Sequence, residues 1–286
     1  MAATVGRGWA ADATARLKKA YMLQTFPGAK SKAPSILEQF RMLKAAGFAG
    51  VEPRSHLDQT EIVAARDTTG LEIASVSCGA HSRLLANANP ATRQQGVDGI
   101  QQALRDAKRY GAKSILVVPG GVSERVSYDD NYKWVQEGVR MCVPLAEELG
   151  VVMAIENVWN NFLLSPLEAA RFVDEFNSKA VGWHFDIGNI LWMAWPEQWI
   201  RILGKRIAAV HLKEFSRKKF EQEGKRKGFE VEYLEGDNDW PVVMKALREI
   251  GYHGWAIAEP AWRPEGVEPA ARLKEISQRM DRILSS

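Results

Sequence analysis

The chain has 286 residues, a formal net charge of +3, 26% charged residues and 46% hydrophobic residues, which is the composition of a soluble globular protein. This charge is too small to favour a nucleic-acid partner, and no stretch of the sequence approaches a membrane span. The two cysteines, Cys78 and Cys142, match no zinc or redox spacing, so we expect reduced, buried thiols. We therefore expect a cytoplasmic protein with no nucleic-acid and no membrane partner.

Residues 1–19 contain no continuous apolar run of the kind found in a signal peptide, and we expect them to form a flexible N-terminal segment. From residue 20 to the end, short apolar runs typical of buried strands alternate with longer amphipathic segments. The expected strands are 20–26, 48–53, 71–80, 112–120, 151–157, 180–189, 206–215 and 254–260, and the helices between or after them are 33–47, 58–69, 90–110, 128–149, 165–177, 196–204, a helix after 238, and 268–284.

Glycines such as Gly111 and Gly150 stand at the helix exits, where a left-handed residue commonly ends a helix. Eight strand–helix repeats predict an α/β protein with a single (β/α)8 TIM barrel over residues 20–286 rather than an open doubly wound sheet. The absence of a G-x-G-x-x-G or Walker A pattern favours the same choice. The one long break, 213–238, is expected to be an extended loop after the seventh strand, and loops of that length are usually functional lids or mobile segments.

Chemically active side chains stand at the carboxyl ends of the last four expected strands. These residues are Glu156, Asp186, His211 and Glu259. In a TIM barrel the strand ends meet at one mouth, so all four side chains could face one point. Any one of them alone is more often a helix cap, an ion-pair partner or a core histidine. Three carboxylates that close would repel one another, and a divalent cation bound by oxygens and one imidazole is the simplest compensation. The pattern predicts a metal site.

Two of these acids, Glu156 and Glu259, suggest a proton-transfer reaction. A proton beside a ketone is weakly acidic, and a cation near the carbonyl and hydroxyl oxygens stabilises the enediolate that its removal leaves. A base must stand within hydrogen-bond reach of that proton. The fifth and eighth strands could approach the ion from opposite sides, so that Glu156 and Glu259 each address one face of the flat intermediate, and one removes the proton while the other returns it.

Several motifs resemble the xylose isomerase-like TIM-barrel superfamily of sugar and sugar-phosphate isomerases and epimerases, over nearly the whole chain from about residue 20. They are "GFAGVEP", "AIEN", "FDIGN", "VHLKEF", "EGDNDWPVVMKALREIGYHGW" and "AIAEP". The branch most resembled contains ketose 3-epimerases and L-ribulose-5-phosphate 3-epimerases. This resemblance implies one divalent ion, with Mn²⁺ expected and Mg²⁺, Co²⁺ or Zn²⁺ as alternatives, held by Glu156, Asp186, His211 and Glu259, with the two glutamates as acid and base. We further expect a sugar or sugar-phosphate substrate and a homo-oligomer.

Three further residues are candidates for substrate contact or support on the later strands. Arg217 lies six residues beyond His211, the spacing at which the similar epimerases carry a substrate-binding arginine. Lys213 should point the same way as His211 and either contacts substrate or forms a salt bridge. His184, two residues before Asp186, should face the barrel interior and orient the ligands.

Glu52 and His81 are expected at the pocket wall, although loop caps would explain them equally well. Asn189 is a further candidate for substrate contact, but the similar epimerases carry a histidine at its position, and Phe162 stands where they carry a glutamate. These two departures put the specificity for a free ketohexose in doubt without touching the metal set. The basic run in 217–227 could attract a phosphate, yet it is diluted by glutamates and such runs are usually solvated faces.

Three other functions remain open. The first is a metal-dependent lyase or dehydratase on a keto-sugar or keto-inositol, resembling inosose dehydratases or 3-keto-glycoside-cleaving enzymes, because the same groups could expel a leaving group. The second is an abasic-site nuclease, which shares this barrel but needs a three-zinc cluster with many histidines, whereas this chain has 5. The third is a sugar-binding or scaffold protein without catalysis, against which the intact set of four strand-end residues argues.

Overall fold

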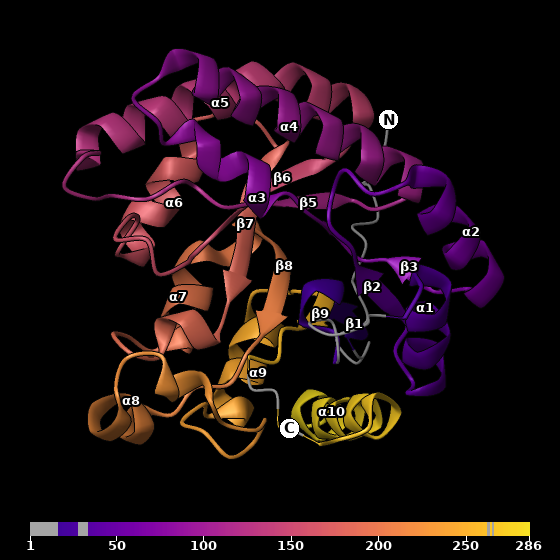
Figure 1. Ribbon diagram of the computed structural model, residues 1–286. Helices are drawn as coiled ribbons and strands as arrows, with labels where there is room; N and C mark the ends of the chain where they lie inside the picture. Colours follow the sequence, from indigo (N-terminus) through magenta and orange to yellow (C-terminus); the bar gives the residue numbers. More distant parts are fainter. Residues whose placement is uncertain (1–16, 28–33, 262–263, 265) are drawn as a thin grey trace, which may run out of the picture.

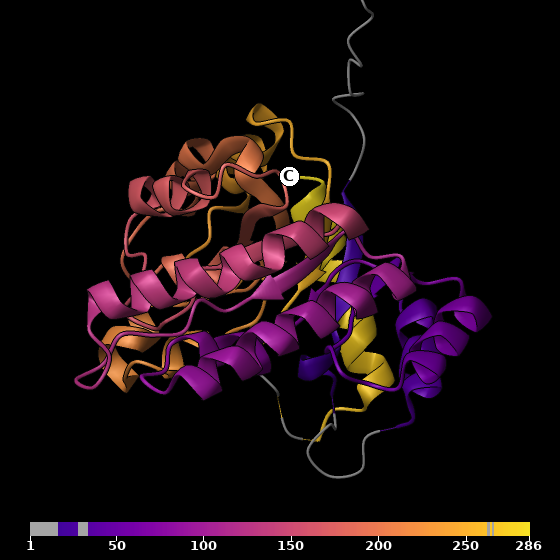
Figure 2. The ribbon, with the colours of Figure 1, turned by 90° about the horizontal axis from the view of Figure 1, so that it is seen from above.

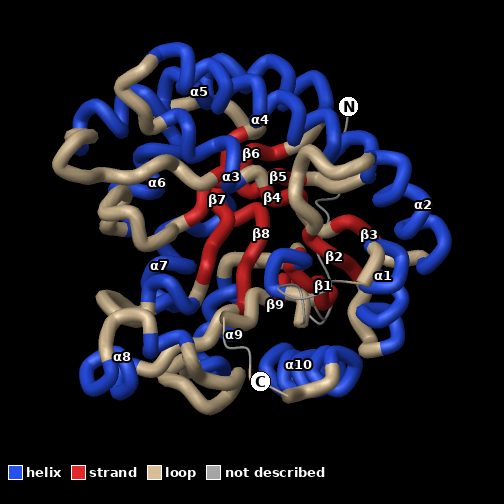
Figure 3. The backbone as a smooth tube through the Cα atoms, viewed as in Figure 1, coloured by secondary structure: helices blue, strands red, loops and turns tan. Residues whose placement is uncertain are grey.

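The computed structural model describes residues 17–27, 34–261, 264 and 266–286. Its strands form a ring at the centre of the molecule and its helices surround them (Figures 1 and 3). The strands are β1 (Lys18–Met22), β2 (Gly50–Glu52), β3 (Glu72–Ile73), β4 (Val76–Ser77), β5 (Ser114–Val117), β6 (Val152–Glu156), β7 (Val181–Asp186), β8 (Ile207–Leu212) and β9 (Trp255–Ala258).

All strand pairs in the described residues are parallel, and the strand order is β3-β2-β1-β9-β8-β7-β6-β5-β4. The strands β3 and β4 stand at the two ends of this order. They belong to one short segment of the chain and together take the place of one strand of the barrel. The ring closes where the backbone of Ser77 donates to the carbonyl of Pro53 at 2.8 Å and accepts from the backbone of Ser55 at 2.9 Å. The predicted TIM barrel is confirmed.

The outer layer consists of α1 (Ile36–Ala45), α2 (Gln59–Thr69), α3 (Gly79–Ser82), α4 (Pro90–Tyr110), α5 (Tyr128–Leu149), α6 (Pro166–Asp174), α7 (Pro196–Leu203), α8 (Arg217–Glu223), α9 (Trp240–Glu249) and α10 (Pro269–Leu284). Short 3-10 turns accompany them at Leu23–Thr25, Arg83–Leu85, Gly188–Ile190, Gly204–Arg206 and Lys227–Phe229. The long helices α4 and α5 pack side by side along one flank (Figure 2). No helix within the described ranges is long and apolar enough to cross a membrane.

Two helices begin and end where the sequence predicts because their caps are local. Asn89 accepts a hydrogen bond from the backbone of Ala91 at the start of α4, which then ends at Gly111 with a φ of 82°. In the same way Ser127 caps α5, and Gly150 ends it with a φ of 64°. Short polar side chains satisfy the free N–H groups of a first turn, and glycine adopts the left-handed conformation without steric cost.

The N-terminal boundary differs from the prediction. Residues 1–16 of the expected flexible segment lie outside the described residues, but Lys18 and Lys19 already belong to β1, which pairs with β9. The ammonium of Lys19 donates to the carbonyl of Ser277 at 3.2 Å and lies 2.8 Å from a carboxylate oxygen of Asp281 on α10. These contacts with the far end of the chain carry the strand two residues further back than local composition indicates.

The connection 213–238 is folded rather than open, since it contains α8 and the 3-10 turn Lys227–Phe229. Its aromatic rings gather beside the barrel mouth, where Phe229 lies 4.7 Å and Phe215 5.8 Å from Trp159 between ring centroids. The buried carboxylate of Glu214 accepts hydrogen bonds from Trp240 at 2.8 Å and from Asn238 at 2.7 Å. Apolar packing and one buried acceptor therefore order this segment.

Small side chains fill the barrel beneath its mouth. Ala20, Ala74, Ala209 and Ile257 form a buried cluster that is separate from the main core. Ala209 lies two residues before His211 on β8, and Ile257 lies two residues before Glu259, so each shares a face with a candidate site residue. The main core lies between the barrel and the helices. The site therefore stands on a packed apolar floor.

Candidate functional site

The four predicted strand-end side chains meet at one point. Glu156 and Asp186 are the last residues of β6 and β7, His211 is the penultimate residue of β8, and Glu259 directly follows β9. Asp186 is the register partner of His211 across the β7–β8 pair. One ligand atom from each of the four residues lies within 4.8 Å of every other. The structure thus brings together the set that the sequence predicts, with three carboxylates and one imidazole in a single cluster.

Burial makes the charges in this cluster costly. Asp186 and His211 are fully buried and Glu156 is 6% exposed, while the side chain of Glu259 keeps 18% of its surface. Burial raises the pKa of Glu156, and it raises the pKa of Asp186 to about 7 despite the nearby ammonium of Lys213. Carboxylates in such surroundings either take up protons or need a cation beside them.

Lys213 supplies part of that positive charge. Its ammonium lies 2.5 Å from Asp186 Oδ2 and 2.9 Å from Glu259 Oε2, and 3.3 Å from Asn189 Oδ1. The side chain points to the same side of the strand as His211, as its spacing predicts. Although burial opposes its charge, contact with Asp186 and Glu259 holds the pKa of Lys213 well above its usual value. One ammonium cannot balance all the carboxylates of the cluster.

The imidazole of His211 is held between carboxylates on both sides. Its Nε2 lies 3.1 Å from Glu52 Oε1, and its Nδ1 lies 3.2 Å from Glu156 Oε1 and 2.9 Å from Glu259 Oε2. Burial lowers the pKa of His211, but the charges of Glu52 and Glu259 raise it more, to well above its usual value. When Nε2 carries the proton that Glu52 accepts, Nδ1 presents a lone pair to the cluster, which is the arrangement of a metal-binding histidine.

Glu52 and His184 lie behind the cluster rather than at the pocket wall. Both are fully buried, and the ring of His184 stands edge-on to that of His211 with 4.1 Å between centroids. Within the described residues neither ring nitrogen of His184 has a hydrogen-bond partner, and burial lowers its pKa well below the usual value. His184 faces the interior, as expected. Glu52 was expected at the pocket wall, but it contacts His211 instead.

Asn157, which sequence reasoning missed, positions Asp186. Its side-chain oxygen accepts from the backbone of Asp186 at 3.0 Å and from the indole of Trp183 at 3.1 Å, while its amide nitrogen donates to the carbonyl of Asp186 at 2.7 Å. These bonds tie the end of β6 to the end of β7. The only sequence signal is its place directly after Glu156.

A cavity of about 620 Å³ opens above the cluster. Of the four cluster residues, Glu156 and Glu259 line it, whereas Asp186 and His211 do not. Among the predicted substrate contacts, Lys213, Asn189 and His81 line the cavity as well. The remaining lining residues, which the sequence did not single out, are Met22, Gln24, Arg54, Ser55, Leu57, Ser77, Gly79, Ala80, Arg83, Leu116, Val118 and Val158.

Arg217 lies outside this cavity. Its guanidinium donates to the carbonyl of Leu191 at 2.7 Å and to the carbonyl of Ala194 at 3.0 Å, and it covers the ring of Trp195. The spacing from His211 that suggested substrate binding therefore places the side chain against the β7–α7 connection. In this structure Arg217 joins that connection to α8.

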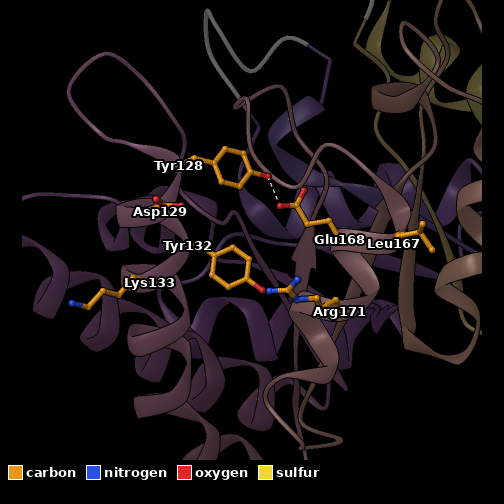
Figure 4. A pocket seen from close by; sticks show the side chains of 7 residues that line it. All are labelled: Tyr128, Asp129, Tyr132, Lys133, Leu167, Glu168 and Arg171. Atoms are coloured by element: carbon orange, nitrogen blue, oxygen red, sulfur yellow. Dashed lines mark hydrogen bonds between the residues drawn. The ribbon is translucent and has the colours of Figure 1, made fainter.

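A second cavity, of about 550 Å³, lies on the outer face between α5 and α6 (Figure 4). Its wall includes Tyr128, whose hydroxyl donates to Glu168 at 2.6 Å, and Arg171 beside Tyr132. Phe162 is buried nearby against Tyr128 and Phe172, and so it does not reach the barrel mouth. None of the four cluster residues lines this outer cavity.

The fold and the site define the class of protein. The xylose isomerase-like TIM barrel family matches residues 40–283, and the chain belongs to that family. Over 264 residues the chain is 23% identical to the putative L-ribulose-5-phosphate 3-epimerase SgbU of Haemophilus influenzae, covering 86% of this chain and 91% of that protein. It is 28% identical over 163 residues to the 3-dehydro-D-guloside 4-epimerase of Escherichia coli, covering 51% of this chain and 62% of that protein. The solved structure of the E. coli 3-keto-D-glucoside 4-epimerase YcjR superposes with a TM-score of 0.77 at 21% identity, covering 95% of this chain and 100% of that one.

Proposed function

We propose that this protein is a divalent-metal-dependent sugar epimerase that acts on a ketose or ketose phosphate by moving a proton at the carbon next to the carbonyl. One observation carries the proposal. Four potential ligands converge within 4.8 Å, and the two glutamates among them, Glu156 and Glu259, are the ones that also reach the cavity. The relatives named above, which are described as sugar epimerases, support the same reaction class.

The residues present fit a divalent ion. Glu156, Asp186, Glu259 and Nδ1 of His211 would hold it, and the three carboxylates carry more negative charge than Lys213 balances. Oxygen donors with one imidazole suit Mn²⁺, with Mg²⁺, Co²⁺ and Zn²⁺ as alternatives. When bound, the ion would draw electron density from the substrate carbonyl and so make the neighbouring proton more acidic. Glu52 would hold the imidazole in the orientation that this requires.

The chain's own groups can move the proton. Burial raises the pKa of Glu156, which favours its protonated form, whereas at Glu259 the contacts with Lys213 and His211 outweigh burial and hold the pKa below its usual value. The two carboxyl groups therefore differ in their surroundings although they belong to one cluster. Glu156 and Glu259 both reach the cavity, so either can accept the proton and the other can return it, and Lys213 and Asn189 line the cavity beside them to bind substrate oxygens.

Metal affinity should fall as the pH falls. The pKa of Asp186 is raised to about 7 by burial, so below that pH the carboxyl group carries a proton and is a poor ligand. The pKa of His211 is also raised, so Nδ1 must lose a proton before it can bind the ion, and we expect Mn²⁺ to lose at least about tenfold in affinity for each pH unit below about 7. Titration calorimetry in buffers of different ionisation enthalpy, from pH 8 to pH 6, measures both effects. Affinity that is constant over this range would contradict the raised pKa values of the ligand groups.

The reaction class is tested by solvent exchange. The Mn²⁺-loaded protein is incubated with ketoses and ketose phosphates in deuterium oxide, and the products are read by NMR. Deuterium at the carbon next to the carbonyl, in a pair of epimers and without loss of water, is the expected result. An ultraviolet-absorbing enone would instead identify a lyase. No exchange with any ketose and no elimination would leave a binding protein. Homo-oligomerisation and a cytoplasmic location stay predictions from the sequence.

A further inference from the structure

The cavity above the carboxylate cluster has a second polar wall that the reaction proposed above does not use. Arg54 follows β2, and His81 and Arg83 belong to α3 and the 3-10 turn after it. All three line the cavity, as do the hydroxyl-bearing side chains of Ser55 and Ser77. Because β2 and β4 are neighbours in the ring, this wall lies at the strand ends away from β6 and β7.

One side of the cavity carries acidic side chains and the other carries arginines. The acids that line the cavity are Glu156 and Glu259, both of which belong to the metal cluster. Arg54 and Arg83 are both exposed. Within the described residues, neither has a carboxylate within ion-pair distance. Two arginines that form no ion pair with the described residues therefore line this part of the cavity. An uncompensated pair of this kind is suited to a planar or tetrahedral anion.

The side of the cavity that carries Arg54, His81 and Arg83 is held in place by packing and hydrogen bonds. The ring of His81 stacks on that of His56 with 3.6 Å between centroids, and Gly99 of α4 leaves the room that His81 needs, since a Cβ there would come within 2.5 Å of His81 Cβ. His56 has a φ of 64°, which is uncommon for a residue other than glycine, and its backbone donates to Asp106 at 2.8 Å. Asp106 also accepts from two glutamine amides, so its charge is directed at these donors and away from the cavity.

We propose that Arg54, His81 and Arg83 form a subsite for an anionic group on the substrate, either a phosphate ester or a carboxylate. This subsite rests on the proposed function, because it requires the carbonyl end of the sugar to lie at the carboxylate cluster. The anionic group then lies at the opposite end of the same molecule. The basic run 217–227, by contrast, does not line the cavity. The substrate class is an acidic ketose rather than a neutral one.

Binding measurements test the subsite without any turnover. The probes are D-fructose, D-fructose 6-phosphate and D-fructuronate, which share a carbon skeleton and differ at the end away from the carbonyl, together with inorganic phosphate on the metal-free protein. We expect at least one anionic sugar to bind about 100-fold more tightly than D-fructose, or about tenfold for each arginine. A preference for D-fructose 6-phosphate identifies a phosphate ester as the recognised group, and a preference for D-fructuronate identifies a carboxylate.

The double variant Arg54→Gln/Arg83→Gln should lose that preference and bind inorganic phosphate at least about tenfold more weakly, while D-fructose affinity changes by less than about twofold. A matched control, Lys218→Ala/Arg226→Ala, removes two positive charges from exposed positions in the run 217–227 and should keep the preference. Circular dichroism checks the folding of each variant. Equal affinity for the three sugars together with no phosphate binding, or an anion preference that survives in the Arg54/Arg83 variant, would overturn the subsite.

The two proposals fail separately. Absence of deuterium exchange together with arginine-dependent anion binding would remove the epimerase and leave the subsite. Exchange on neutral ketoses with no gain from a phosphate or carboxylate would leave the epimerase and remove the subsite.

Discussion

Glutamine in place of Glu156 or Glu259 is expected to lower the rate of deuterium exchange by roughly 10²–10⁴-fold, the usual contribution of a general acid or base. Each amide keeps an oxygen that can still contact a cation, but it can neither accept nor supply the transferred proton. Both side chains line the cavity, so the loss should appear in kcat more than in KM. The measurement is the initial rate of exchange by NMR with the Mn²⁺-loaded variants.

Glu124→Gln is the matched control, because this glutamate is exposed in the β5–α5 connection and does not line the cavity. Its exchange rate should equal that of the unchanged protein. If either Glu156→Gln or Glu259→Gln retained full exchange, that glutamate would be a ligand at most, and the acid–base pair would have to be sought among Lys213 and His81.

Alanine at Asp186 or His211 should release the metal. Either change removes a donor from a cluster whose atoms lie within 4.8 Å, and Asp186→Ala also leaves the buried ammonium of Lys213 with fewer acids beside it. Since loss of an outer partner alone typically costs about 10–100-fold in affinity, we expect more than about 100-fold for a direct ligand. Metal content after gel filtration, together with titration of the metal-free variants, provides the measurement.

Two exposed residues serve as controls for these substitutions. His253→Ala removes an exposed imidazole, and Asp174→Ala removes an exposed carboxylate that pairs with Arg206. Neither should change the stoichiometry or affinity of the metal, and the surface ion pair contributes only about 0–1 kcal/mol to stability. Stoichiometric, tightly bound metal in His211→Ala would refute the ligand set.

The barrel could be predicted because its signals are local. Caps at Asn89 and Ser127 and glycines at 111 and 150 define the two longest helices of the outer layer, and they act within a single turn. The start of β1 and the folding of 213–238 could not be predicted in the same way. They depend on Lys19 reaching α10 and on aromatic rings that meet across the barrel mouth, which no short window of sequence contains.

In the candidate site, too, the residues set by local sequence could be predicted and those set by tertiary contacts could not. Glu156, Asp186 and Glu259 were predictable because each ends an apolar run, and the barrel carries every strand end to one mouth. Arg217 was placed by spacing alone, but its side chain binds the carbonyls of Leu191 and Ala194, whose positions depend on a loop from another unit. The role of Asn157 depends likewise on the β6–β7 register, which only the folded chain supplies.

The position of Lys213 has a practical consequence. Its ammonium acts as an internal counter-ion for Asp186 and Glu259, so the chain itself offsets part of the electrostatic repulsion among the clustered carboxylates. Small domains that depend on a metal for their fold unfold when a chelator removes it, whereas this barrel has a large hydrophobic core of its own. We infer that apoprotein can be prepared intact here and reloaded with one ion after another, which allows the choice of metal to be compared on a single preparation.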